Sequence, residues 1–386
     1  MTIAGAPTVT TPAASITPVP FMKFETTEGD IESVLKVLKS GMLRAAAKCA
    51  ELETRFGEMS QANFAMTCAN GTCALQLAYE PLFQPGDEVL VPAWSYIATA
   101  SMLVARGCTP IFIDALPTTG QIDMADAAKR ITPKTKGIAA THMYGCPVDI
   151  DAVQAVASKH GLKIVYDAAQ AHLATYKGKG IGQFGDAVTY SFYATKNLGT
   201  GEGGMVTCND AGLARKIQLL RSHGESDKYL HEQVGYNYRM NDLTGALGCS
   251  RLDRLPADTT ARRAAAARYD ALLASIPGIE PLAVTPGAVS AYHLYTVRMD
   301  SAALSCTRDQ FCKDLMALGV PTAVHYPRTL TQQPAFKAQI VGQPAWPVAE
   351  RLAQTVFCLP MHSFLTDGHF ATIESALRAV ARRYAR

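Results

Sequence analysis

Short apolar runs alternate with amphipathic segments along the first two thirds of the chain. In residues 30–39, for example, Ile31, Leu35 and Leu38 recur at helical spacing on one face. Apolar runs of about five residues are typical of buried strands. Helices are predicted at residues 30–39, 51–59, 73–83, 98–105 and 151–160, and strands at 88–92, 110–114, 137–141, 162–167, 187–192 and 204–208. This alternation predicts an α/β fold with a mostly parallel sheet covered on both faces.

The pattern changes after Leu255-Pro256. A long helix rich in alanine and arginine is predicted at 258–275. A strand at 292–299, a helix at 308–318, a strand at 322–325 and a last helix at 369–385 follow. We therefore predict a large α/β domain over residues 21–254 and a smaller α+β domain over 255–386. The first twenty residues are rich in threonine, proline and alanine and predict a disordered tail.

Composition excludes several classes of protein. Hydrophobic residues make up 48% of the 386 residues, charged residues only 18%, and the net charge is +3. This balance favours neither nucleic-acid nor membrane binding, and no run of 18 apolar residues exists. The ten cysteines form no C-x-x-C pair and have no histidine at zinc-ligand spacing, so no metal site is predicted. The sequence thus predicts a cytoplasmic protein with reduced thiols.

Candidate chemistry gathers at the predicted strand ends. Asp167 ends the run 162–166, and Lys196 lies between Ser191 and the glycine-rich segment 199–204. Ligands of parallel sheets bind beyond the carboxyl ends of the strands. Pyridoxal 5'-phosphate (PLP) requires an amine for a Schiff base, a carboxylate for its pyridine nitrogen and donors for its phosphate. Lys196 and Asp167 offer the first two, although Asp167 could equally be a helix N-cap and lone lysines are mostly surface charges.

Further residues could complete such a site. Gly71 and Thr72 precede a helix whose free N–H groups could bind a phosphate, and the Ser191 hydroxyl could add to them. Thr72 could also be a plain N-cap. Tyr96 could stack on a cofactor ring, although an aromatic residue after a strand is more often part of the core. Gln170 follows Asp167 closely enough to line the same pocket.

Taken together, these residues resemble the DegT/StrS family of sugar aminotransferases. The resemblance runs from about Glu28 to the C-terminus. It is carried by ordered motifs: Asn70-Gly71-Thr72, Gly86-Asp87-Glu88-Val89, Ile131-Thr132-Pro133-Lys134-Thr135-Lys136, His142-Met143-Tyr144-Gly145, Asp167-Ala168-Ala169-Gln170-Ala171-His172, Phe184-Gly185-Asp186, Ser191-Phe192-Tyr193-Ala194-Thr195-Lys196-Asn197, Gly235-Tyr236-Asn237-Tyr238-Arg239-Met240 and His325-Tyr326-Pro327. It implies the fold type I architecture of PLP enzymes, with a mostly parallel seven-stranded sheet and a smaller C-terminal α+β domain.

The resemblance also implies roles. Lys196 would bond the cofactor and shuttle a proton, Asp167 would bind the pyridine nitrogen, and Gln170 would contact the phenolic oxygen. The remaining implied contacts are Tyr96 to the ring, Gly71, Thr72 and Ser191 to the phosphate, and Arg239, His325 and Tyr326 to the substrate. Asn237 would reach the phosphate of a neighbouring subunit. The active unit would therefore be a homodimer with shared active sites.

The implied reaction is transfer of an amino group from an amino acid, L-glutamate or L-glutamine, to a keto-sugar or keto-cyclitol. One departure concerns the substrate end. Family members usually carry a Gly-Pro pair before the second helix, where this chain has Arg44-Ala45-Ala46-Ala47-Lys48. PLP-dependent lyase, dehydratase or cyclase chemistry is therefore the alternative. A non-catalytic regulatory relative is a third reading, which the presence of both Lys196 and Asp167 disfavours.

Overall fold

The computed structural model describes residues 18–386. Its centre is a seven-stranded sheet in the order β1-β9-β8-β5-β4-β2-β3, in which β9 alone runs against its neighbours. The strands are β1 (Phe64–Cys68), β2 (Glu88–Pro92), β3 (Thr109–Ile113), β4 (Thr135–Thr141), β5 (Lys163–Asp167), β8 (Ala187–Ser191) and β9 (Gly204–Cys208). The predicted parallel α/β sheet is confirmed.

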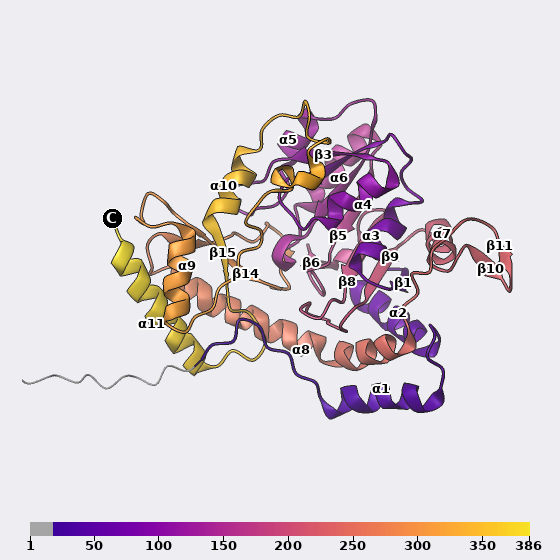
Figure 1. The fold of residues 1–386 in the computed structure, drawn as a ribbon, viewed down its shortest axis with the longest axis horizontal. Coiled ribbons are helices and arrows are strands. Elements are labelled where there is room, and N and C mark those ends of the chain that lie inside the picture. Colours follow the sequence, from indigo (N-terminus) through magenta and orange to yellow (C-terminus); the bar gives the residue numbers. More distant parts are fainter. Residues whose placement is uncertain (1–17) are drawn as a thin grey trace, which may run out of the picture.

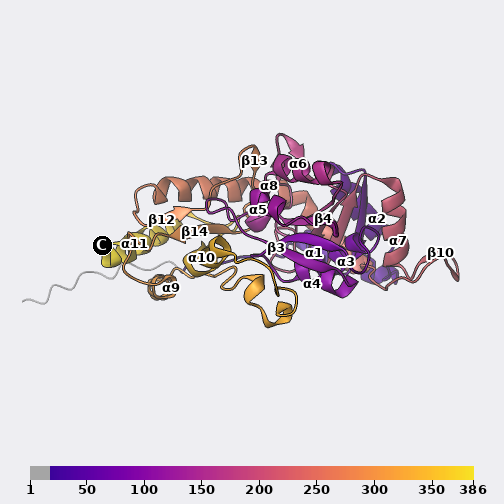
Figure 2. The same ribbon diagram turned by 90° about the horizontal axis from the view of Figure 1, so that it is seen from above.

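Helices cover both faces of this sheet (Figures 1 and 2). The buried side chains of α3, α4 and α7 form a core on one face, and those of α2, α5, α6 and the first half of α8 form a core on the other. The helices are α1 (Glu28–Ser40), α2 (Ala47–Ser60), α3 (Gly71–Tyr79), α4 (Ala98–Arg106), α5 (Met124–Lys129), α6 (Ile150–His160), α7 (Ala211–Arg221) and α8 (Asp242–Leu273).

The C-terminal part has a core of its own. A three-stranded sheet in the order β12-β14-β15 packs with α9 and α11. Its elements are β12 (Ile279–Pro281), β14 (Tyr295–Met299), α9 (Arg308–Ala317), β15 (Val356–Leu359) and α11 (Asp367–Tyr384). Helix α10 (Pro347–Thr355) buries its side chains in the core that contains α3, α4 and α7. A further small sheet has three short strands in the order β13-β6-β7, namely β6 (Thr175–Tyr176), β7 (Lys179–Gly180) and β13 (Ala288–Val289).

Helix α8 corrects the predicted helix start at residue 258. It begins at Asp242, spans 32 residues and runs along both parts of the molecule, with Pro256 inside it (Figure 1). Proline cannot donate to the preceding turn. Burial of Leu252, Leu255 and Thr259 on either side nevertheless keeps this stretch helical. The predicted domain boundary at residues 254–255 lies within this helix, and the division into two domains stays a prediction.

The other corrections are local. The predicted strand 322–325 is wrong, because Ala323 forms only an isolated bridge with Cys358. Strand β1 was not predicted. It pairs antiparallel with β9, a strand about 140 residues away in the chain, and so depends on a contact that the local sequence does not show. The predicted tail falls mostly on residues 1–17, outside the described residues. At its end, Val19 is 5% exposed and packs in the C-terminal core.

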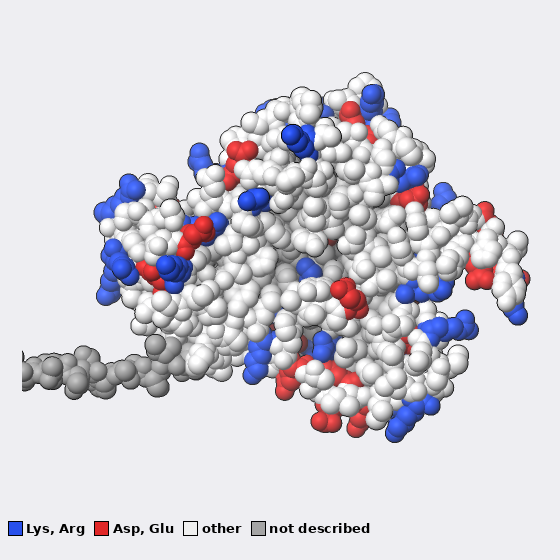
Figure 3. Space-filling view, viewed as in Figure 1, with Lys and Arg blue, Asp and Glu red and all other residues white. Residues whose placement is uncertain are grey.

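A hairpin of β10 (Glu225–Asp227) and β11 (Leu230–His231) projects from one end of the molecule (Figures 1 and 2). On the face shown in Figure 3, acidic and basic side chains are interspersed around the rim of a largely uncharged centre. Among residues 18–386, no helix is long and apolar enough to cross a membrane.

Candidate active site

Asp167 is the last residue of β5 and is 4% exposed. Its Oδ2 accepts a hydrogen bond of 2.6 Å from the Thr99 hydroxyl, and its Oδ1 accepts one of 3.1 Å from the Ala169 backbone N–H. Burial raises the pKa of this carboxyl above its usual value, and the Thr99 bond opposes that rise. No basic nitrogen within residues 18–386 lies within 4.0 Å of Asp167. A buried carboxylate that has no cation beside it favours binding of a positively charged partner.

Thr99 was not among the residues predicted from the sequence. It lies in the first turn of α4 and is fully buried, and its hydroxyl is also 3.4 Å from those of Ser95 and Thr141. The Ser95 and Thr141 hydroxyls are 3.0 Å apart. This hydroxyl cluster lies beside Asp167 and links the start of α4, the end of β4 and the loop after β2. Nothing in the sequence signals it, because Thr99 is 68 residues from Asp167.

Lys196 lies in the loop between β8 and β9. Its amide donates to the Tyr193 carbonyl at 2.8 Å, and the loop is closed by Ala194 N–H to the Gly201 carbonyl at 2.9 Å. Burial lowers the pKa of Lys196 from 10.5 to about 8, while the charge of Asp167 opposes that fall. A lysine with this pKa is partly neutral near pH 8, so it can act as a nucleophile and as a proton carrier.

The start of α3 lies against the end of β8. The Asn70 side chain caps the helix by accepting from Cys73 N–H at 2.9 Å. The N–H groups of Gly71 and Thr72 make no hydrogen bond within the described chain. A Cβ on Gly71 would lie 2.7 Å from the Ser191 Cβ, so glycine lets the helix end approach this serine. Two free N–H groups beside a hydroxyl form a suitable anion site.

Gln170 joins the sheet end to the C-terminal part. Its Oε1 accepts from Tyr144 N–H at 2.6 Å, and its Nε2 donates to the Tyr326 hydroxyl at 3.2 Å. The Tyr326 ring centroid is 6.0 Å from that of Tyr96, which is 56% exposed. The Tyr144 hydroxyl donates to the carbonyl of His325. The structure therefore brings Gln170, Tyr96, His325 and Tyr326 together.

Two predicted residues, Asn237 and Arg239, do not join this cluster. Both are exposed, on a segment fixed to α3 by the hydrogen bond from the Tyr238 hydroxyl to Gln76 at 2.9 Å. Within the described residues, neither Asn237 nor Arg239 forms a side-chain hydrogen bond or ion pair with the site residues named above. The role predicted for Asn237 requires a second subunit.

The atypical loop before α2 is also anchored. The Asp242 carboxylate, from the first turn of α8, accepts from the backbone N–H groups of Ala46, Lys48 and Cys49 at 2.8–3.1 Å. Ala46 is the N-cap residue of α2 and has no side-chain acceptor. Asp242 thus caps α2 from a distant part of the chain. Arg44, in the same loop, is exposed.

The sequence profile of the DegT/DnrJ/EryC1/StrS aminotransferase family matches residues 25–378. The chain belongs to this family. Its profile covers nearly all of the described residues, including every residue of the site. The predicted family and aminotransferase class are thereby confirmed, while the roles of individual site residues stay predictions.

Individual relatives are similar along most of their length. A UDP-2-acetamido-2-deoxy-3-oxo-D-glucuronate aminotransferase of Pseudomonas aeruginosa is 37% identical, over 89% of this chain and 94% of that protein. A protein of Geobacillus stearothermophilus named pleiotropic regulatory protein is 36% identical, over 89% of this chain and 92% of that protein. The crystal structure of Streptomyces venezuelae DesV with a ketimine intermediate superposes with a TM-score of 0.89 at 35% identity, covering 95% of this chain and 99% of that chain. The predicted aminotransferase fold is confirmed.

Proposed function

We propose that this protein is a PLP-dependent aminotransferase that moves an amino group from L-glutamate or L-glutamine to a keto-sugar or keto-cyclitol. The observation that carries the proposal is a pair of groups with oppositely shifted pKa values, the buried Asp167 and the half-buried Lys196, at or just beyond the carboxyl ends of β5 and β8. Burial lowers the pKa of Lys196 to about 8 and raises the pKa of Asp167. Pairs of titratable groups whose environments shift their pKa values are typical of catalytic sites.

The residues fit PLP at each of its reactive parts. Asp167 has no cationic partner within 4.0 Å in the described chain, and a protonated pyridine nitrogen would supply one. The free N–H groups of Gly71 and Thr72 beside Ser191 suit a phosphate. Gln170 offers its amide to the phenolic oxygen, and Tyr96 offers an exposed ring face.

When bound, PLP supplies an electron sink that stabilises negative charge on the substrate carbon. The protein's own residues do the rest. Asp167 would hold the proton on the ring nitrogen and so maintain the sink. Lys196 Nζ, whose pKa burial lowers to about 8, would take a proton from one carbon and return it to another. Arg239, His325 and Tyr326 are proposed to contact the substrate.

The relative from Pseudomonas aeruginosa is named for a 3-oxo sugar, and this supports a ketone of a sugar as the acceptor. The test is an absorbance spectrum of the protein purified with PLP, before and after L-glutamate and then L-glutamine. A visible band that moves to shorter wavelength identifies the donor. Keto-sugars and keto-cyclitols are then screened for those that restore the band. A band that neither donor moves in wild type would contradict the proposal.

A homodimer with shared sites is part of the proposal. Asn237 is exposed, as expected for a residue that reaches a neighbour, and one face of α1 exposes Ile31, Leu35 and Leu38 by 42–51%. Variants Lys196→Ala and Asn237→Ala test it, because a hybrid dimer would hold one intact site. Activity regained on mixing and refolding two inactive variants supports shared sites. Continued inactivity of hybrids contradicts them. A cytoplasmic location stays a prediction.

Two other functions can be distinguished from amino transfer. The Geobacillus relative is named as a regulatory protein, yet this chain keeps both Lys196 and Asp167, which a non-catalytic relative does not need. Lyase, dehydratase or cyclase chemistry is suggested by the segment Arg44–Lys48, whose sequence departs from the family pattern and whose last two residues begin α2. Consumption of an amino acid without amino transfer to any ketone would favour this second alternative.

A further inference from the structure

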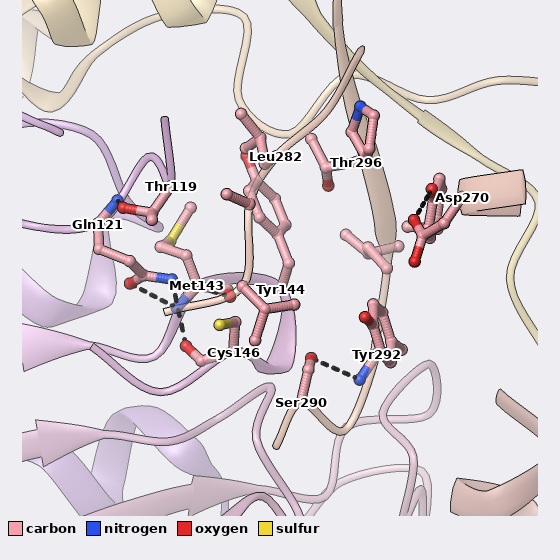
Figure 4. A pocket seen from close by; sticks show the side chains of 15 residues that line it. Thr119, Gln121, Met143, Tyr144, Cys146, Asp270, Leu282, Ser290, Tyr292 and Thr296 are labelled. Carbon is pink, nitrogen blue, oxygen red and sulfur yellow. Dashed lines mark hydrogen bonds between the residues drawn. The ribbon is translucent and has the colours of Figure 1, made fainter. Parts of the chain in front are cut away.

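Residues 290–294 separate the Lys196 loop from a cavity of about 220 Å³. We call this segment the strut. Ser290, Tyr292 and Leu294 line the cavity, together with Tyr144 and Leu282 on its other walls (Figure 4). The two intervening residues, Ala291 and His293, instead bond Asn197, the residue after Lys196. Because cavity walls lack packing partners on one side, polar bonds must fix the position of this strut.

Those polar bonds come from two other parts of the site. Ala291 N–H donates to the Gly145 carbonyl at 2.9 Å, and Leu294 N–H donates to the Tyr144 carbonyl at 3.3 Å. Tyr144 N–H is the donor to Gln170. The strut is therefore bonded on one edge to the residues that hold Gln170 and on the other to the loop that carries Lys196.

Arg262 of α8 fixes the same strut from the C-terminal side. It is 5% exposed, and its guanidinium donates to the carbonyls of Tyr292 at 3.2 Å and His293 at 3.4 Å. A third bond, of 3.1 Å, goes to the carbonyl of Met361. A buried cation that binds only backbone carbonyls holds a backbone in place.

The bond between Asn197 and His293 has a defined direction. Asn197 Nδ2 donates to the Ala291 carbonyl at 3.1 Å, which can only accept, so Asn197 Oδ1 faces His293. The distance from His293 Nδ1 to this oxygen is 3.2 Å. The Nδ1 atom must therefore carry the proton. Burial lowers the pKa of His293 well below its usual value, so the ring is neutral.

We propose that His293 is a positioning residue that acts through Asn197 to hold Lys196 in reach of the cofactor carbonyl. The inference rests on the proposed function and extends it to a residue outside the predicted site. Its physical basis is that Asn197 is fixed by two bonds to the strut, and that Lys196 is its chain neighbour. The bond therefore holds the lysine in position. The phosphate and ring contacts come from other parts of the chain, namely α3, the ends of β5 and β8, and the segment between β2 and α4.

This difference gives a selective test. PLP is retained partly through its bond to Lys196, whereas pyridoxamine 5'-phosphate has no carbonyl and relies on the phosphate and ring contacts alone. The affinities of both forms are measured for wild type, His293→Leu and His293→Asn by equilibrium dialysis. Leucine removes the Nδ1 donor, while asparagine places an amide N–H near the same position. Thermal melting in pyridoxamine 5'-phosphate verifies folding.

Loss of one buried hydrogen bond lowers an equilibrium constant by up to about tenfold. We expect His293→Leu to bind PLP about tenfold more weakly, with the visible band of the lysine-bound form reduced, and pyridoxamine 5'-phosphate within about twofold of wild type. We expect His293→Asn to restore PLP binding. If His293→Leu does not fold, Asn197→Ala is measured in its place, with the same PLP-selective loss expected.

The inference is overturned if both cofactor forms weaken equally, if PLP binding is unchanged, or if asparagine restores nothing. Each of these outcomes indicates that His293 only packs in the core. A wild-type protein that binds neither form would instead overturn the proposed function itself, and with it this inference. Failure of the two proposals can thus be told apart in one experiment.

Discussion

Replacing Thr99 with valine should weaken catalysis while leaving the fold intact. Valine is β-branched like threonine and has nearly its shape, so it fills the fully buried site but lacks the hydroxyl. The change removes the 2.6 Å hydrogen bond from the Thr99 hydroxyl to Asp167 Oδ2. It also removes the two longer contacts, of 3.4 Å each, between this hydroxyl and those of Ser95 and Thr141. The Ser95 and Thr141 hydroxyls keep their own 3.0 Å contact, and Asp167 keeps the Ala169 N–H. The main perturbation is therefore the loss of a donor to the carboxylate.

The magnitude follows from the charge on Asp167. A hydrogen bond to a charged group contributes about 1.5–3 kcal/mol, and burial prevents water from replacing it. Loss of this donor should therefore raise the Asp167 pKa further. A more basic carboxylate draws the proton away from the pyridine nitrogen and so weakens the electron sink. Since about 1.4 kcal/mol corresponds to a factor of ten, the rate of the amino-donor half-reaction should fall by about tenfold to a hundredfold.

The assay is single-turnover absorbance with the donor identified above, for wild type, Thr99→Val and Thr99→Ser. Serine keeps the hydroxyl and should stay close to wild type. Far-ultraviolet circular dichroism and thermal melting verify the fold. A valine variant that reacts within twofold of wild type would refute the reasoning, because Asp167 would then not depend on this hydroxyl.

Three further predictions concern the site and its support. In cofactor-free protein, acylation of Lys196 followed by peptide mass spectrometry should rise with pH around a midpoint of about 8, since burial lowers its pKa and the neutral amine reacts; a midpoint near 10.5 would contradict this. Asp242→Ala should lower the free energy of unfolding, measured in urea, by about 1–3 kcal/mol, because three backbone N–H groups lose their acceptor. The control Asp253→Ala, which removes an exposed ion pair, should change this free energy by under about 0.5 kcal/mol. Gly71→Ala should weaken binding of pyridoxamine 5'-phosphate in dialysis, because its Cβ would lie 2.7 Å from the Ser191 Cβ; unchanged affinity would place the phosphate elsewhere.

The sequence alone determined the fold class, and it singled out Asp167 and Lys196 as candidates for the chemistry. Strand periodicity and chain order are local properties, so β2 and β9 were predicted with the bounds that the structure shows. The positions of Asp167 and Lys196 after predicted strands followed from the rule that ligands bind at the carboxyl edge of parallel sheets. The family motifs supplied the expected chemistry because their residues are contiguous in the chain.

Only the tertiary structure showed how these residues are supported. Thr99 reaches Asp167 across 68 residues, Asp242 caps α2 across 194–196 residues in two of its bonds, and His293 bonds Asn197 across 96 residues. Such contacts depend on how the chain packs, and no local pattern encodes them. Likewise, Pro256 lies inside a helix because packing of its neighbours outweighs local propensity. The sequence therefore indicated which groups are candidates for the chemistry, and the packing of distant segments decided what holds them in place.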